Sequence, residues 1–222
     1  GSTITWYVNG IQVATGTLSG THKVSALGSY DGGLAPFDGK MYGSYIYSRA
    51  LSDSEITNIV GGISMSTDDL EGYYPIAEGF GVTIHDVSGN GNHGTATNVT
   101  EASFWGTKQD VYHYNITEGF SKRMYFNGSD TYVRLDSNPF ANKSNIYVEA
   151  EYLPNNISDS DCIVGSWATD TNMSLLLFTA SGGELRCRVK NTSGTVSSDA
   201  TATGVLQANV KAKVAVRYDG TD

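Results

Sequence analysis

The sequence has 222 residues, with 26 glycines and 14 tyrosines but only 4 prolines, and charged residues make up 17% of it. This composition excludes a disordered or fibrous chain, and the length suits one large β-rich domain that can bury a substantial core. The formal net charge of -9 argues against binding to nucleic acid or anionic lipid, because contacts to phosphate need lysine and arginine. No run of about 18 apolar residues occurs, so we expect no membrane insertion, and we expect that any secretion signal has been removed.

The first segment predicts a β-hairpin. Apolar and polar side chains alternate from Ile4 to Val8, and an apolar residue returns at Ile11. Between them Asn9-Gly10 supplies the two residues with positive φ that a type I′ turn requires. This is the strongest local signal in the chain.

One short helix is predicted after residue 51. Ser52 and Glu55 have the spacing of a capping box, in which each side chain bonds the backbone N–H of the other residue. Ile56 and Ile59 supply an apolar side, and Gly61-Gly62 ends the helix.

Alternating apolar residues predict further strands toward the C-terminus, at residues 147–152, 174–178, 185–189 and 214–216. Alternation also places Cys187 on a buried face with Leu185 and Val189. Cys162 lies in another strand-like segment. We interpret both cysteines as buried free thiols, and a disulfide is the alternative.

Five segments carry a family resemblance. They have the sequences PFDGK (36–40), IYSRALSDSEI (46–56), LEGYYPIAEGFG (70–81), DVSGNGNHG (86–94) and MYFNGSDTYV (124–133). These motifs resemble those of laminin G-like domains in the concanavalin A-like jelly-roll superfamily. The resemblance implies an all-β fold, a two-sheet antiparallel jelly-roll sandwich with one short helix.

The motifs stand in a displaced order relative to that family. Residues 213–222 followed by residues 1–18 resemble one continuous family hairpin. The resemblance implies a single domain in which residues 1–63 are the C-terminal part of the fold, 64–69 a linker and 70–222 the N-terminal part. The chain is then a circular permutant or a fragment of a tandem array. For one permuted domain, the strand around Trp6 should pair with the strand around Val216.

A calcium site is predicted in the loop 86–94. Asp86, Asn90 and Asn92 supply side-chain oxygens, and the glycines between them leave backbone carbonyls accessible, as Ca²⁺ requires. The alternative is that these side chains form consecutive turns by bonding their own backbone. The family commonly has an acidic pair where this chain has Tyr42-Gly43, which removes one source of ligands.

Glu149 and Glu151 are the best evidence for an enzyme in the sequence, and that evidence is weak. Residues i and i+2 share one strand face about 7 Å apart, a separation that glycosidases use. We expect both to be exposed on the solvent side of a sheet, with Lys143 and Arg134 the nearest basic residues in sequence. The strand lacks the E-x-D-x-x-E pattern that the superfamily's glucanases carry.

Aromatic residues in expected loops offer a carbohydrate site, because sugar rings stack on aromatic faces while amides and carboxylates bond their hydroxyls. The candidate ligand-binding residues are Trp105, Tyr112, Trp167, Asp170 and Asn172. The alternative is that Trp105 and Trp167 fill the rim of the sandwich.

The resemblance and the composition together predict a non-catalytic recognition module outside the cell, on a cell or virion surface. We expect its partner to be a glycan or a cell-surface receptor, next to neighbouring repeats or domains of a larger protein. The alternative is a structural or adhesion module of a surface or phage-tail assembly that binds protein, and a glycoside hydrolase is third.

Overall fold

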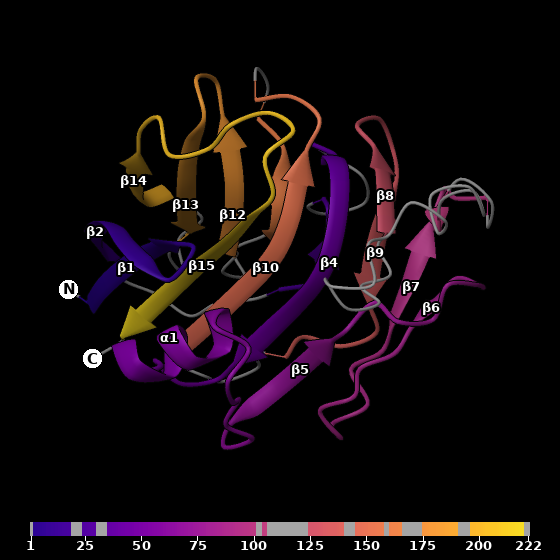
Figure 1. Cartoon of the computed structure of the whole chain (residues 1–222), viewed down its shortest axis with the longest axis horizontal. Coiled ribbons are helices and arrows are strands. Elements are labelled where there is room, and N and C mark those ends of the chain that lie inside the picture. Colours follow the sequence, from indigo (N-terminus) through magenta and orange to yellow (C-terminus); the bar gives the residue numbers. More distant parts are fainter. Residues whose placement is uncertain are drawn as a thin grey trace.

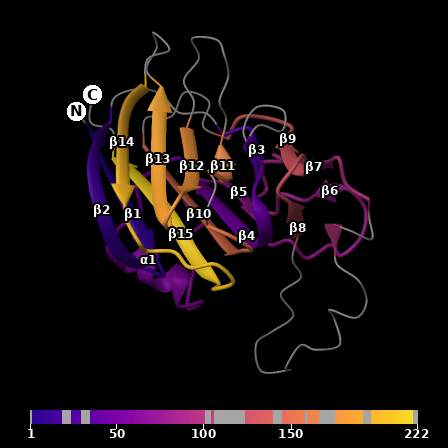
Figure 2. The same ribbon diagram turned by 90° about the horizontal axis from the view of Figure 1, so that it is seen from above.

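The computed structural model describes residues 2–18, 24–29, 35–100, 104–105, 124–139, 145–157, 160–165, 175–190 and 196–219. Within them the chain forms two antiparallel sheets that stack face to face, with one helix on the outer side of the first sheet (Figures 1 and 2). The expected all-β, two-sheet antiparallel sandwich is confirmed.

The first sheet has the strand order β2-β1-β15-β10-β4-β5, and β8 also pairs with β4. Its strands are β1 (Ser2–Val8), β2 (Ile11–Leu18), β4 (Asp38–Tyr47), β5 (Leu70–Tyr74), β8 (Met124–Asn127), β10 (Ile146–Pro154) and β15 (Ala212–Asp219). Each pairing is antiparallel.

The second sheet has the order β14-β13-β12-β11-β3-β9-β7-β6. Its strands are β3 (Ala26–Leu27), β6 (Thr83–Ile84), β7 (Gly94–Thr97), β9 (Tyr132–Leu135), β11 (Cys162–Gly165), β12 (Leu175–Ala180), β13 (Glu184–Lys190) and β14 (Val196–Ala202). The inner faces of the two sheets enclose the main hydrophobic core, which includes Trp6, Phe37, Phe126, Val148 and Leu177.

The predicted hairpin is confirmed. Asn9 and Gly10 have φ values of 51° and 79°, as a turn with two positive φ angles demands. The strand β1 also pairs with β15 within the same chain, and Trp6 lies opposite Val216. The pairing expected for one closed domain is therefore present, and it joins the first and last strands of the described chain.

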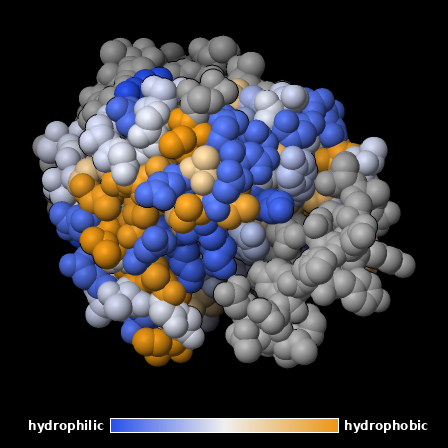
Figure 3. All heavy atoms as spheres, turned by 45° about the horizontal axis from the view of Figure 1, so that its top comes forward, coloured by the Kyte–Doolittle hydropathy of each residue, from blue (hydrophilic) through white to orange (hydrophobic). Residues whose placement is uncertain are grey.

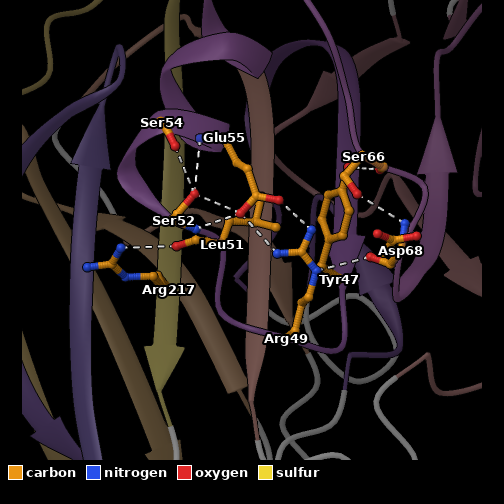
Figure 4. A network of polar contacts seen from close by, with 9 residues as sticks. All are labelled: Tyr47, Arg49, Leu51, Ser52, Ser54, Glu55, Ser66, Asp68 and Arg217. Atoms are coloured by element: carbon orange, nitrogen blue, oxygen red, sulfur yellow. Dashed lines mark hydrogen bonds and ion pairs between the residues drawn. The ribbon is translucent and has the colours of Figure 1, made fainter.

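The helix α1 (Asp53–Val60) begins with the predicted capping box. Ser52 Oγ accepts a hydrogen bond from Glu55 N, and Glu55 Oε2 accepts one from Ser52 N at 2.8 Å. Figure 4 shows Arg49 reaching back to Glu55, with two guanidinium–carboxylate contacts of 2.6 and 3.0 Å. The polar network fixes the orientation of the helix's first turn.

The helix covers part of the outer face of the first sheet. Ile56 and Ile59 point into a second apolar cluster that contains Tyr7, Tyr47, Leu51, Leu70, Tyr147 and Ala215. Tyrosines predominate here because their rings bury apolar area while their hydroxyls reach polar partners. Tyr47, for example, donates to Ser66 O at 2.8 Å.

Both cysteines are buried free thiols, as predicted, and burial raises the pKa of Cys162. Cys187 belongs to the main core, whereas Cys162 packs with Leu176 and Phe178 in a separate cluster. None of the helices in the described ranges is long and apolar enough to span a membrane.

Candidate functional site

A pocket of about 330 Å³ lies on the outer face of the first sheet, beside the C-terminal end of α1. We call it the outer-face site; it is lined by Asn9, Val60, Glu151, Lys211, Ala212 and Lys213. These residues come from the β1–β2 turn, the last turn of α1, β10, and β15 with the residue before it. This volume is at the lower end of the range of small-molecule sites, and the pocket is open to solvent and not enclosed.

Strand register brings the charged residues of the site together. Glu151 of β10 lies opposite Lys213 of β15 and, on the other side, opposite Gly43 of β4. Glu151 Oε1 is 2.8 Å from Lys211 Nζ, and its Oε2 is 3.9 Å from Lys213 Nζ. The site therefore contains one carboxylate and two ammonium groups.

The backbone around these side chains is firmly held. Lys213 N donates to Asn9 Oδ1 at 2.9 Å, and Asn9 N donates to Lys213 O at 2.8 Å. Lys213 Nζ donates to Val60 O at 3.0 Å, which joins β15 to the last turn of the helix. A cation is favourable there because the carbonyl end of a helix carries partial negative charge.

An aromatic ring lies beside the pocket. Lys211 Nζ is 5.1 Å from the centroid of the Tyr42 ring, and Tyr45 stacks on Tyr73 with 4.6 Å between ring centroids. Tyr45 is the residue that follows Gly43 on the same face of β4. Polar groups and half-buried aromatic rings thus share this part of the sheet.

The expectation that Glu149 and Glu151 are both exposed is wrong for Glu149. The side chain of Glu151 is only partly exposed, at 24%, and Glu149 is 1% exposed. The physical reason is that the outer face is covered at Glu149 by tyrosine rings and α1, a layer that a strand pattern alone does not reveal. Glu149 Oε2 accepts a 2.5 Å hydrogen bond from the Tyr147 hydroxyl.

The two carboxyl groups consequently differ in their electrostatics. Burial raises the pKa of Glu149, and the hydrogen bond from Tyr147 and the charge of Lys213 oppose that shift. The basic partners of Glu151 are Lys211 and Lys213. Arg134 belongs to β9 of the second sheet, and Lys143 lies outside the described residues.

The Asp86 loop has the side-chain bonds of a folded turn. Asp86 is 6% exposed, its Oδ1 accepts from Tyr73 N and Ser88 N, and its Oδ2 accepts from Ser88 Oγ and Asn92 N. Burial alone would raise the pKa of Asp86, but these hydrogen bonds outweigh it and lower the pKa. The carboxylate therefore anchors the loop to β5.

The two asparagines of the loop also face β5. Asn90 Nδ2 donates to Leu70 O and Asn92 Nδ2 donates to Glu71 O, both at 2.7 Å, while Asn92 Oδ1 accepts from Ser137 Oγ. In the described part of the chain no group of three or more His, Cys, Asp or Glu side chains is placed to hold a metal ion. The structure thus brings the three predicted ligands together through bonds to the protein itself, and calcium stays a prediction.

Of the predicted carbohydrate-binding residues, Trp105 is described. It is partly buried against the main core, meets Phe104 edge-on, and donates its indole N–H to Gly81 O at 2.8 Å. Tyr112, Trp167, Asp170 and Asn172 lie outside the described residues.

In the surface view, hydrophilic and hydrophobic residues alternate in small patches (Figure 3). No broad apolar area appears among the coloured atoms of that face. A face of this kind suits recognition through several polar contacts with apolar contacts between them.

Comparison with known families adds one finding. Residues 1–57 match the family model of the concanavalin A-like lectin/glucanases superfamily of laminin G type. This match confirms the laminin G-like resemblance, and the two-sheet sandwich is the fold expected for that superfamily. No curated protein and no solved structure matched the chain.

The sequence did not indicate the outer-face site. In the sequence Glu151 stands out only as half of a carboxylate pair, and Lys213 is about 60 residues distant from it in the chain. The alternation of apolar and polar residues around Glu151 and Lys213 indicates that each lies in a strand, but it does not indicate which strands are neighbours. Only the β10–β15 register makes them neighbours.

Proposed function

We propose that this protein is a non-catalytic recognition module that binds carbohydrate on a cell or virion surface, with the outer-face site as its binding site. The observation that carries the proposal is the pocket of about 330 Å³ with a carboxylate, two ammonium groups and an amide beside the Tyr42 ring. Such groups both donate hydrogen bonds to sugar hydroxyls and accept hydrogen bonds from them, and the apolar face of a sugar stacks on an aromatic ring. The family match supports a binding module in general.

The tryptophan region is a second proposed contact area. Trp105, Tyr112, Trp167, Asp170 and Asn172 retain the residue types that carbohydrate recognition uses. The indole N–H of Trp105 already donates a hydrogen bond to Gly81 O. Trp105 would therefore contact a ligand through the face or edge of its ring.

Calcium at Asp86, Asn90 and Asn92 remains a proposal beside the carbohydrate one. An ion bound only to the native state would stabilise it by mass action. Melting temperature measured in EDTA and then in excess Ca²⁺ tests it, and equal values in both would remove calcium from the proposed function.

The test of function is a glycan array on the purified protein, with and without EDTA, followed by titration of each hit. Glu151→Gln and Lys213→Met should weaken binding at least tenfold if the outer-face site holds the sugar. Glu184→Gln is the matched control, because Glu184 forms a 2.6 Å ion pair with Arg186 at similar exposure on the other sheet.

The outcomes separate the candidate functions. Hits that respond to Glu151→Gln support the proposal, and hits that respond only to Trp105→Ala move the site to the tryptophan region. A blank array favours the alternative, a structural or adhesion module that binds protein in a larger surface or phage-tail assembly.

A further inference from the structure

A carboxyl group is buried on the outer face of the first sheet, bonded to a tyrosine of the apolar cluster into which Ile56 and Ile59 of α1 pack. Glu149 lies on β10, a strand with neighbours on both sides, opposite Ala215 on one side and Tyr45 on the other. Its exposed fraction is 1%, whereas glutamates are almost never fully buried unless they are paired. The structure gives it a hydroxyl partner, Tyr147, at 2.5 Å.

The groups around Glu149 are mainly neutral. Two tyrosines of β4 and one of β1 belong to the same layer, β10 adds a tyrosine and a second carboxylate, and β15 adds two cations. In chain order these titratable or charged residues are Tyr7, Tyr45, Tyr47, Tyr147, Glu151, Lys213 and Arg217.

The cations of this region are already engaged. Lys213 bonds Val60 O and approaches Glu151, and Arg217 bonds Asp53 and the carbonyl of Leu51. The helix itself presents Ile56 and Ile59 to the layer, while its acidic residues Asp53 and Glu55 bond Arg217 and Arg49. Among the described residues, no cation makes an ion pair with Glu149.

An ionised carboxylate in this position is costly. It would lose its hydration without gaining an ion pair, and the tyrosine layer offers it one strong hydrogen bond. The neutral acid avoids most of that cost. Burial accordingly raises the pKa of Glu149, and the bond from Tyr147 acts in the opposite direction.

We propose that Glu149 is a proton-dependent lock on the tyrosine layer beneath α1. As the neutral acid bonded to Tyr147, which belongs to the same apolar cluster as Ile56 and Ile59 of α1, it holds that layer closed, and loss of the proton loosens it. Loosening would reach the outer-face site directly, because Val60 is both the last residue of α1 and part of that site's wall. The proposal concerns stability and does not depend on the identity of the ligand.

The direction of the pH effect follows from linkage. A carboxyl group whose pKa is higher in the folded state contributes its full stabilisation below its ordinary value of 4.5. That contribution is lost as pH rises toward and through the folded-state pKa. The protein should therefore become less stable on the alkaline side, opposite to the behaviour of an ion-paired glutamate.

Hydrogen exchange of the α1 amides and urea unfolding, both between pH 4 and pH 9, test the proposal. In the wild type, the protection of the Ile56 and Ile59 amides, corrected for intrinsic exchange, should fall with pH by up to tenfold per unit. Glu149→Gln should remove this pH dependence, and Glu151→Gln, the control two residues away on the same face, should retain it.

Tyr147→Phe gives an independent test that mere packing damage would not reproduce. Removing the hydroxyl removes the bond that favours the ionised form, so the loss of protection should move to higher pH. If Glu149→Gln does not fold, the direction in which Tyr147→Phe shifts the pH of lost protection decides whether the proposal holds. Unchanged pH dependence in Glu149→Gln, a shift to lower pH in Tyr147→Phe, or constant wild-type protection would each overturn the proposal.

Discussion

Glu151 lies directly opposite Lys213 in the antiparallel pair of β10 and β15, and on its other side it faces Gly43, which has no side chain. Gly43 does not itself line the outer-face site, but it is the neighbour of Glu151 on β4, so a side chain added there would lie beside the site. A Cβ added to Gly43 would have Tyr74 O at 3.4 Å as its nearest neighbour, so the backbone tolerates a side chain there.

Gly43→Thr should therefore reduce glycan binding without loss of stability. Threonine is favoured in strands, and replacing a strand glycine should leave the free energy of unfolding unchanged or raise it by up to about 1 kcal/mol. Urea unfolding checks stability, and titration with a glycan hit checks binding. Unchanged affinity would show that the ligand makes no contact beside Gly43.

Ser52→Ala should destabilise the protein by about 1 kcal/mol, because it removes the acceptor for Glu55 N at the start of α1. Ser54→Ala is the matched control, since Ser54 is an exposed serine of the same turn whose hydroxyl contacts only Ser52 Oγ among the bonds of Figure 4. Urea unfolding of both variants should separate them; equal destabilisation would argue against the cap.

Acid should lower the stability of the first turn of α1. Hydrogen bonds from Arg49 and Ser52 lower the pKa of Glu55 to about 2, so its contribution is present above its ordinary value of 4.5 and is lost as pH falls toward 2. The pair is partly exposed, and its effect should be small and reduced by salt. Melting temperature from pH 5 to pH 2 should fall less steeply in Glu55→Gln than in the wild type.

The local elements of this protein were predictable, and the family resemblance also implied the pairing of β1 with β15, whereas the side-chain contacts across the sheets were not predictable. Asn9-Gly10 and the Ser52–Glu55 spacing specify a turn and a cap through bonds between residues close in sequence. Alternation likewise placed Cys187 in the core. These predictions needed no tertiary information.

Glu149 shows where prediction from the sequence failed. Alternation places it on the same face as Glu151, and that face is partly exposed at Glu151 and covered at Glu149. The difference arises because α1, about 90 residues away in the chain, packs over part of the sheet. Such coverage depends on tertiary packing, which the strand pattern does not contain.

Asp86→Asn should destabilise the protein by about 1–3 kcal/mol even in EDTA. The carboxylate accepts four hydrogen bonds, and an amide would direct N–H groups at some of those donors. Urea unfolding in EDTA isolates this role from any metal. A variant as stable as the wild type in EDTA, but weaker in Ca²⁺, would instead assign the residue to the ion.

We expect no release of reducing sugar from a panel of β-glucans and galactans. Glycosidases need an acid and an ionised carboxylate on either side of an accessible bond. Here Glu149 has the raised pKa of an acid, but its 1% exposed carboxyl is enclosed by tyrosines, where a sugar cannot reach it. Hydrolysis that both Glu149→Gln and Glu151→Gln abolish would establish an enzyme and overturn the non-catalytic assignment.

The pairing of Trp6 with Val216 supports a last prediction, about the order of the fold. The first and last described strands are neighbours in one sheet, with Thr3 opposite Asp219, so a short linker between the two ends should complete a hairpin. A new chain that starts at Leu70 and ends at Asp69, with the old ends joined, should then fold as a monomer. Residues 64–69 stay in this chain because the carbonyls of Ser66, Asp68 and Asp69 accept hydrogen bonds from Tyr47, Arg49 and Ser48. Its melting temperature should lie within a few degrees of the wild type, and its β-sheet circular dichroism should be the same.

A rearranged chain that aggregates or associates into dimers would contradict the permuted order. That outcome would favour a fragment of a tandem array, in which strands of one molecule complete the sheet of another.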